Sequence, residues 1–440
     1  MKRFILEQSD EEFYSSHSGL ALVGLCVNRF ARLGKAMKRA IPLRHGISHE
    51  DVSKSYLGLM CLGKSDFEAV AGVREDDFFQ QALGIGRVPS AETLRQRLDE
   101  HAPAMRTVID EANVEFMVNA KAPVSALKTG HVPLDIDVFP MNNSGTRKEG
   151  VSRTYHGYDG YAPIAAYLGT EGWCLACELR EGKQHSQKEF GYVLDRILPR
   201  ARRLTRLPLL VRQDSAHDAL ENRLRYVEEE VDFIIKWNPR GEDPAQWLER
   251  AERQGVWEAP RPGKRVALFS VVEEHDHQGH TYCFRRVIRV TERTIDKKGQ
   301  TLLVPDIELE GWWTSLAYPD EQIVALYQDH GTSEQFHSEF KTDLDIERLP
   351  SGKFDTNDLV LAFGVFAYNI LRFIGLIGLT GKAAPLRHPA KCRRLRTVIQ
   401  ELMYLAARLI ATGRRLKLRF SRLCPGFRAF QQVYYQLAFG

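Results

Sequence analysis

The sequence predicts a mixed α/β sheet covered by helices, with a helical region before it, a β-rich insertion within it and a basic helical region after it. Three observations carry this prediction: helical apolar clusters early in the chain, period-two alternation from about residue 130, and strand patterns with Gly-containing turns beyond residue 240. The 440 residues are too many for one ordinary core. We expect a helical domain at residues 1–125 and a core in two parts, at 126–240 and 323–380. The β-rich insertion at 241–322 lies between the two parts of the core, and a basic C-terminal region follows at 381–440.

The composition, with 43% hydrophobic and 27% charged residues, is typical of a soluble globular protein. No apolar run has the length of a transmembrane helix, and the start turns acidic too early, at Glu7, for a signal peptide. The odd number of cysteines, seven, indicates free thiols in a reducing cytoplasm. Cys174 and Cys177 have zinc-like spacing, but no second Cys or His pair accompanies them and they fall on an expected strand.

The first region contains a turn followed by a helix start at residues 84–98. Ser90 is a good N-cap, and Glu92 stands in the first turn, where the helix dipole favours an acid. The short helix that follows presents Arg95 and Arg97. A short helix after a Gly-bearing turn, with Arg and Gln facing outward, suits a helix-turn-helix that contacts DNA. The alternative is an ordinary capped surface helix.

The core begins where residues 131–139 alternate between apolar and acidic side chains, the pattern of a strand. Asp135 and Asp137 therefore point to one face. Further strands are expected at 165–168, 173–179, 209–215 and 231–237, and helices at 186–203 and 217–229. In a sheet ordered 3-2-1-4-5 the first and fourth strands are neighbours, so that Asp137 and Asp214 would lie side by side.

The insertion is expected to contain strands at 265–272, 281–291 and 302–309. Trp312 and Trp313 stand beside its return to the core. Both rings could stack on an unpaired base, or they could pack in the interior of a strand. Residues 359–379 are strongly apolar, but Asn369 and Arg372 interrupt them, which favours a buried core helix over a membrane span.

The spacing in a polar stretch at residues 327–341 predicts a helix that has acidic, basic and aromatic side chains, rather than apolar ones, on one side. At about 100° per residue, its four candidate side chains fall within an arc of about 60°: Tyr327, His330, Glu334 and Lys341. Thr332 and Gln335 form a capping-box pair, so the regular helix would begin at Ser333. In that case only Glu334 and Lys341, which are seven residues apart, are expected to share one face of the regular helix, and Tyr327 and His330 belong to the preceding turn.

Three carboxylates stand out by position, namely Asp137 (or Asp135), Asp214 and Glu334. A helix packed on the sheet edge could bring Glu334 to the two aspartates. Carboxylates that converge without His or Cys suit hard cations such as Mg²⁺ or Mn²⁺. Two ions about 4 Å apart would activate a water or a 3′-hydroxyl and stabilise the leaving oxygen of a phosphodiester.

The net charge of +4 is unevenly placed. Residues 382–428 hold thirteen Lys and Arg against one acid, Glu401. A region this basic usually has a polyanion as partner, whereas the alternative is a solvated helix face. Interleaved apolar residues favour folded structure over a tail, and the alternation at 415–420 indicates a late strand.

Taken together, these motifs resemble a DDE transposase of a bacterial insertion sequence, a family with an RNase H-like core. The resemblance is greatest to the group that has a β-rich insertion before the Glu and a Tyr-Arg-Glu-Lys signature. Residues 327–341 show that signature with His330 in place of the Arg. Residues 134–137 and 211–218 resemble the two Asp motifs, and the resemblance covers roughly residues 80–380.

The resemblance implies roles for these residues. Asp137, Asp214 and Glu334 would bind two Mg²⁺ or Mn²⁺ ions, with Asp135 as the alternative first acid. Tyr327 and Lys341 would hold backbone phosphates, and His330 would do so more weakly than an Arg.

The implied function is an enzyme that binds double-stranded DNA at the ends of its element, cuts it and transfers the strand to a target. The helical and basic regions would help to bind DNA, and the enzyme would act as a homodimer on the bacterial nucleoid, in the cytoplasm. The alternatives are a nuclease or resolvase on the same core and a non-catalytic DNA-binding protein descended from a transposase.

Overall fold

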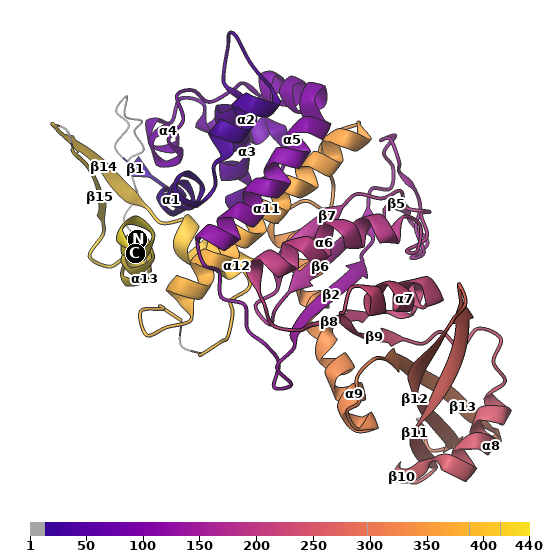
Figure 1. The fold of residues 1–440 in the computed structure, drawn as a ribbon. Coiled ribbons are helices and arrows are strands. Elements are labelled where there is room, and N and C mark those ends of the chain that lie inside the picture. Colours follow the sequence, from indigo (N-terminus) through magenta and orange to yellow (C-terminus); the bar gives the residue numbers. More distant parts are fainter. Residues whose placement is uncertain (1–13, 297, 387, 414) are drawn as a thin grey trace.

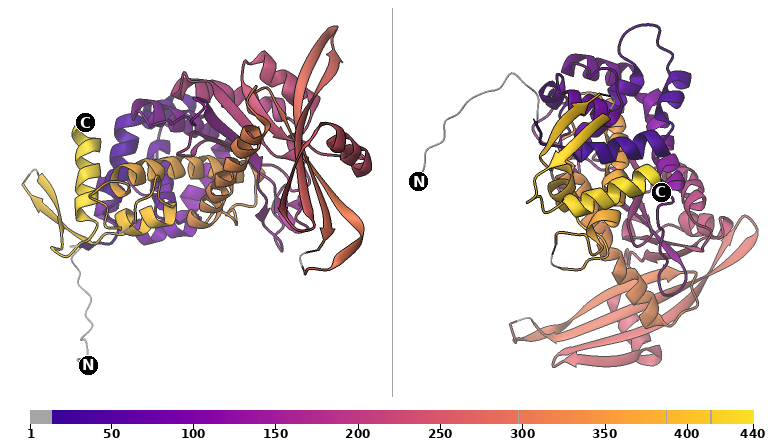
Figure 2. Two further views of the ribbon diagram at one scale, coloured as in Figure 1. Left: turned by 90° about the horizontal axis from the view of Figure 1, so that it is seen from below. Right: turned by 90° about the vertical axis from the view of Figure 1, so that its left-hand side faces the viewer.

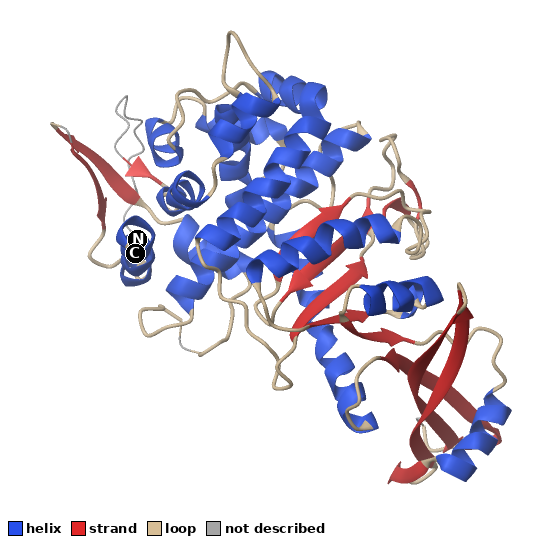
Figure 3. Ribbon diagram, viewed as in Figure 1, coloured by secondary structure: helices blue, strands red, loops and turns tan. Residues whose placement is uncertain are grey.

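The computed structural model describes residues 14–296, 298–386, 388–413 and 415–440 (Figure 1). The side chains of His330, Thr332 and Ser333 also lie outside the described part. At the centre is a mixed sheet of nine strands in the order β10-β11-β12-β13-β9-β8-β2-β6-β7 (Figure 3). This mixed α/β architecture agrees with the prediction.

Five of these strands form the predicted core: β2 (Val132–Val138), β6 (Ile164–Leu168), β7 (Trp173–Glu178), β8 (Leu209–Gln213) and β9 (Asp232–Lys236). β2 pairs antiparallel with β6 and parallel with β8, and β8 pairs parallel with β9. In chain order the arrangement is third, second, first, fourth, fifth, as predicted. The first and fourth strands are therefore neighbours, which positions the candidate site.

Two crossover helices connect the parallel strands: α6 (Phe190–Leu204) and α7 (Leu220–Glu228). The buried residues of α6 recur every three or four positions, from Phe190 to Ala201, so the helix covers the sheet with one apolar face. α7 begins three residues later than predicted because Ser215–His217 form a separate 3₁₀ turn.

A helical layer packs on the other side of β6 and β7. Its long members are α5 (Ala91–Asn119) and α11 (Phe354–Leu379), which lie side by side in Figures 1 and 2. Phe116 of α5 meets Phe373 of α11, with 5.6 Å between ring centroids. By length and composition α11 could cross a membrane, but 89% of its most apolar window is buried in the fold. It is the core helix that the sequence predicted.

Four shorter helices complete the N-terminal part: α1 (Leu20–Phe30), α2 (Leu33–Ala40), α3 (His49–Cys61) and α4 (Asp77–Leu83). Ser90 caps α5 as predicted, because its side chain accepts a hydrogen bond from the Thr93 amide over 3.1 Å. α5 runs on to Asn119, but it is kinked at His101 (φ −122°, ψ 15°), just before Pro103. Its first part is therefore a short helix as predicted, and a second, largely buried part follows the kink.

The insertion extends the central sheet rather than forming a second one. It contains α8 (Pro244–Gln254), β10 (Val256–Arg261), β11 (Lys264–His277), β12 (His280–Ile295) and β13 (Thr301–Thr314). The end of β13, Trp312–Thr314, pairs antiparallel with β9. The long strands project away from the helical layer in Figure 2.

The C-terminal region is less helical than predicted. Between α12 (Leu395–Val398) and α13 (Phe427–Phe439) lies a hairpin of β14 (Ala407–Thr412) and β15 (Arg415–Phe420). Alternating residues make this hairpin two-faced, which is why it forms strands. Leu409 pairs with Leu418 on one face, and Arg408 pairs with Arg419 on the other. β1 (Tyr14–Ser15) joins its edge.

Candidate active site

Asp137 and Asp214 stand at one edge of the sheet, at the ends of neighbouring parallel strands. The β2–β8 register pairs Leu134 with Val211 and Asp135 with Arg212. Two residues further on, β2 reaches Asp137 and β8 ends just before Asp214. The pairing therefore brings both aspartates to the same level, as the predicted strand order required.

Local hydrogen bonds orient both carboxylates. Asp137 Oδ1 accepts from the amide of Val138 over 2.7 Å. Asp214 Oδ1 accepts from the amide of Ala216 over 3.1 Å and so caps the 3₁₀ turn that follows β8. Both residues are half-buried. Each side chain is thus fixed at a strand end instead of moving freely in solvent.

Asp135 shares the face of Asp137 but has a different environment. It is 3% exposed, and its two oxygens accept from Nε and Nη2 of Arg212 over 2.7 and 2.8 Å. Arg212 also donates to the carbonyl of Leu326. A buried carboxylate held by both prongs of a guanidinium is poorly suited to a metal. This geometry favours Asp137 as the first acid.

Two tyrosines flank the pair of aspartates. Tyr327 lies in the last turn of α9 (Asp320–Gln328), and its pKa is raised by burial and by the nearby Asp214, Asp137 and Asp135 carboxylates. The hydroxyl of Tyr155 lies 3.4 Å from the carbonyl oxygen of Val138. Burial and the same two carboxylates, Asp137 and Asp214, also raise the pKa of Tyr155. Both phenols therefore stay protonated near neutral pH and can donate hydrogen bonds.

Tyr155 is not among the residues that the sequence singled out, because the Gly- and Asp-containing residues 156–160 that follow it are typical of a turn. The available signal was the density of aromatic residues, since Tyr155, His156 and Tyr158 occur within four positions.

The polar stretch at 327–341 is not one helix. α9 ends at Gln328, a 3₁₀ turn covers Asp329–Gly331, α10 spans Thr332–Ser338 and a π turn covers Glu339–Asp343. The expected capping box involves Thr332, whose side chain lies outside the described residues. The side-chain Nε2 of Gln335 donates instead to Oε1 of Glu339, over 2.7 Å. His330 likewise lies outside the described side chains.

α10 is anchored close to the end of β2. The ring of Phe139, two residues after Asp137, lies 4.6 Å from the ring of His337. Lys341 Nζ donates to the carbonyl of Pro140 over 3.3 Å. The structure therefore brings Lys341 to the strand end that carries Asp137.

Glu334 occupies the first turn of α10 and is exposed. Within the described part of the chain, no group of three or more His, Cys, Asp or Glu residues is placed to hold a metal ion. The convergence of Glu334 with the two aspartates therefore stays a prediction. Asp137 and Asp214 by themselves supply the oxygen ligands that Mg²⁺ or Mn²⁺ prefers, so the donor chemistry fits.

The two tryptophans are not presented to a base. Trp312 is 1% exposed and Trp313 is 3% exposed. The guanidinium of Arg289 lies 5.2 Å from the Trp312 ring, and that of Arg223 lies 4.1 Å from the Trp313 ring. These rings pack within the sheet, which was the alternative interpretation, because β13 returns to the core at this point.

The candidate DNA-contacting arginines of α5 lie at its first turns, far along the chain from the aspartates. Arg95 is exposed and pairs with Glu68 over 2.8 Å. Arg97 is half-buried beside the turn at Gly46. Their contact with DNA stays a prediction.

The family described as "Transposase DDE domain group 1" matches residues 7–439. No curated protein matches the sequence. Among solved structures, the chain is similar to the cryo-EM structure of a piggyBac transposase synaptic complex with hairpin DNA, at a TM-score of 0.40 and 10% identity, over 88% of this chain and 80% of that one. The predicted resemblance is confirmed at the level of the family. Since the family match spans nearly the whole chain, the protein belongs to the DDE transposases, enzymes of DNA cleavage and transposition.

Proposed function

We propose that this enzyme binds the ends of an insertion sequence of the Tyr-Arg-Glu-Lys group, cleaves DNA there and joins the freed 3′-hydroxyl to a target. The observation that carries the proposal is the placement of Asp137 and Asp214 at the ends of adjacent parallel strands. In a chain of the DDE family, two acids so placed are the natural start of a phosphodiester-cleaving site.

Asp137 and Asp214 would hold the divalent cations, Mg²⁺ or Mn²⁺, two per site, and Glu334 would join them from α10. When bound, such ions activate the attacking oxygen and stabilise the leaving one. The protein's own contribution is positional, because hydrogen bonds to the amides of Val138 and Ala216 orient the two carboxylates. The RNase H-like description of the core belongs to the same proposal and is supported by the strand order.

Lys341, Tyr327 and His330 would contact phosphates of the cleaved strand. Lys341 is held at the end of β2 by its bond to Pro140. Tyr327 keeps its proton because its pKa is raised by burial and by the neighbouring carboxylates, so it can donate to a phosphate oxygen. A cation and a neutral donor near two acids suit an anionic strand that is cut at the acids.

Duplex DNA would also contact Arg95, Arg97 and the basic C-terminal region. The structure divides the cations of that region into two sets. Arg394 is engaged by Asp343 over 2.8 Å. In contrast, Arg415, Lys417 and Arg419 are exposed along β15, on the face opposite its leucines. This cationic face supports contact with phosphates. We further propose a homodimer on DNA, in the bacterial cytoplasm at the nucleoid.

The test uses the purified full-length protein with Mg²⁺ and a duplex taken from the inverted repeats that flank the gene. We expect the unaltered protein to nick at the element end. Asp214→Asn should bind the duplex and fail to cut it, because the amide is a poor ligand for a hard cation. Equal cutting by Asp214→Asn would refute the metal assignment.

The matched control is Asp195→Asn. Asp195 lies on the outer face of α6, is 60% exposed and pairs with Arg225. It should cut like the unaltered protein. Joined products, seen as labelled element ends covalently attached to a target plasmid, separate a transposase from the nuclease or resolvase alternative, which would release cut ends only.

A further inference from the structure

A small hairpin beyond the end of β2 carries three aromatic rings at its tip. The hairpin consists of β4 (Ser152–Arg153) and β5 (Asp159–Tyr161), and β5 also pairs with β3 (Met141–Asn142). We call Tyr155, His156 and Tyr158 the aromatic tip. β5, which leads out of it, is labelled in Figure 1.

The tip has a defined backbone. The amide and the hydroxyl of Thr154 both donate to the carbonyl of Tyr158, over 2.9 and 2.8 Å. The amide of Gly157 donates to the carbonyl of Thr154, and Gly157 adopts φ +80°, a conformation that favours glycine. The rings are therefore held on a closed turn and do not hang from a loose loop.

The rings lie together, with Tyr155 and His156 exposed and Tyr158 half-buried. The centroids of Tyr155 and His156 are 4.5 Å apart, and those of His156 and Tyr158 are 6.0 Å apart at an interplanar angle of 16°. Tyr155 is 69% exposed, although its hydroxyl is turned inward to Val138. Single exposed aromatics are ordinary on protein surfaces. Three within four residues, on a turn held by hydrogen bonds, form a platform.

The platform borders the two aspartates. The hydroxyl of Tyr155 contacts the residue that directly follows Asp137. Both Asp137 and Asp214 are close enough to Tyr155 to perturb its ionisation. A ligand lying on the exposed face of the ring would therefore be next to the bond that the acids act on.

We propose that the aromatic tip binds an unpaired nucleotide of the DNA strand being cut, by stacking its base on Tyr155 and His156. This inference rests on the proposed function and adds that the bound DNA strand has an unpaired base next to the site of cleavage. Bases within a duplex already stack on each other, so an exposed ring is of use to a base that has left the helix. Arg153 at the base of the turn is exposed and pairs with Asp159 over 3.5 Å, a surface contact weak enough for the guanidinium to turn to the neighbouring phosphate.

The competing occupant is another protein surface, such as a second copy of this chain. The observations favour a nucleotide. The platform stands beside the candidate catalytic acids, where the strand must pass, and its turn carries the exposed, charged pair of Arg153 and Asp159.

The test is equilibrium binding of fluorescein-labelled oligothymidine, about twelve nucleotides long, compared with a duplex of equal length, without divalent metal. We expect Tyr155→Ala to weaken oligothymidine binding about tenfold, at the lower end of what one stacked base contributes, and to leave duplex binding unchanged. Tyr155→Phe should bind oligothymidine like the unaltered protein, because it keeps the ring.

The control is Tyr192→Ala. Tyr192 is an exposed tyrosine of α6, 59% accessible, whose ring stacks on Arg196. It should change neither affinity. Thermal melting of each variant checks that the fold is intact.

Three outcomes would overturn the inference while leaving the proposed function standing. The first is unchanged oligothymidine binding by Tyr155→Ala. The second is an equal loss for oligothymidine and duplex, which would indicate general polyanion binding. The third is a loss in Tyr155→Phe as large as in Tyr155→Ala, which would mean that the hydroxyl and not the ring matters. If the unaltered protein bound neither DNA, the proposed function would fail as well.

Discussion

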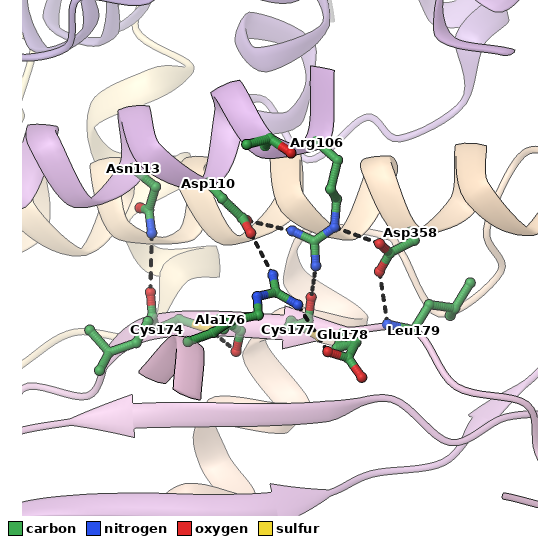
Figure 4. Close-up of polar contacts among 12 residues, drawn as sticks. Arg106, Asp110, Asn113, Cys174, Ala176, Cys177, Glu178, Leu179 and Asp358 are labelled. Atoms are coloured by element: carbon green, nitrogen blue, oxygen red, sulfur yellow. Dashed lines mark hydrogen bonds and ion pairs between the residues drawn. The ribbon is translucent and has the colours of Figure 1, made fainter. Parts of the chain in front are cut away.

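Two acidic clusters of this protein invite comparison. One surrounds Arg106 of α5 (Figure 4), where the guanidinium bonds Asp110, Asp358 and the carbonyl of Cys177. Asp110 also accepts from Arg196 over 2.6 Å. The other is the edge of the sheet with Asp137 and Asp214, whose carboxylates accept from backbone amides at strand ends.

The partners differ, and so do the consequences. Burial would raise the pKa of Asp110, but Arg106, Arg200 and Arg196 outweigh it and hold the pKa below its usual value. That cluster is internally neutralised and joins α5 and α11 to β7. At the sheet edge burial, and after it the carboxylates of Asp137 and Asp214, raise the pKa of two tyrosines, Tyr327 and Tyr155. The first arrangement stabilises the fold, whereas for the second we propose the binding of a divalent cation.

Asp137→Asn tests the functional side of this comparison and should have the largest effect. We expect cleavage to fall by about 10³-fold or more, comparable to the loss of a strong electrostatic group from an active site. The melting temperature should change little. The measurements are nicking of an element-end duplex and thermal unfolding. If the variant lost cleavage only because it unfolded, Asp137 would have a structural role like that of Asp110, and the comparison would fail.

Asp110→Asn tests the structural side. Removing one charge from a buried, paired cluster costs about 3–5 kcal/mol, so we expect a large drop in the free energy of unfolding in urea. Under strongly stabilising conditions the folded variant should still cut DNA. Glu111→Gln is the control, because Glu111 is an exposed neighbour that pairs with Arg203 at the surface. Unchanged stability of Asp110→Asn would break the comparison.

The sequence was informative where periodicity decides the structure. Alternation predicted that Asp135 and Asp137 share a face. The strand order 3-2-1-4-5, which was the condition for Asp214 to lie beside β2, is the order found. The sequence could not choose between Asp135 and Asp137, because that choice depends on Arg212, which meets Asp135 only through pairing of strands that lie 77 residues apart.

The same limit explains the other misses. Thirteen basic residues at 382–428 predicted a polyanion surface, but a count of charges cannot show that Asp343 engages Arg394. The polar stretch looked like one helix because its spacing is helical. The fold interrupts it at Asp329–Gly331 and again at Glu339, which is buried in an ion pair with Arg372 over 2.7 Å.

Asp135→Asn sharpens the comparison within a single strand. The variant neutralises a carboxylate that accepts two bonds from the buried Arg212 guanidinium and leaves that charge uncompensated, so we expect about 3–5 kcal/mol of destabilisation, as for Asp110→Asn. Cleavage per folded molecule should remain within a few-fold of the unaltered protein. Urea unfolding and cleavage corrected for the folded fraction measure the two effects. A loss of cleavage as large as that of Asp137→Asn, with stability retained, would make Asp135 the first catalytic acid.

Tyr327→Phe should give the smallest effect. It tests whether the hydroxyl of Tyr327, beside the two aspartates, acts as a hydrogen-bond donor during cleavage. The carboxylates and burial raise the pKa of Tyr327 above its ordinary value near 10, so the hydroxyl remains a donor throughout the usual assay range. Its removal should weaken cleavage by about tenfold, the value of one hydrogen bond to a charged oxygen, and leave the ring packed on Trp312 at 6.0 Å. Since a phenol with a raised pKa does not ionise below pH 9, the ratio of the two activities should be constant from pH 7 to about 9. A ratio that fell toward one within that range would show that Tyr327 loses its proton there, and would contradict the view that the acids keep it a donor.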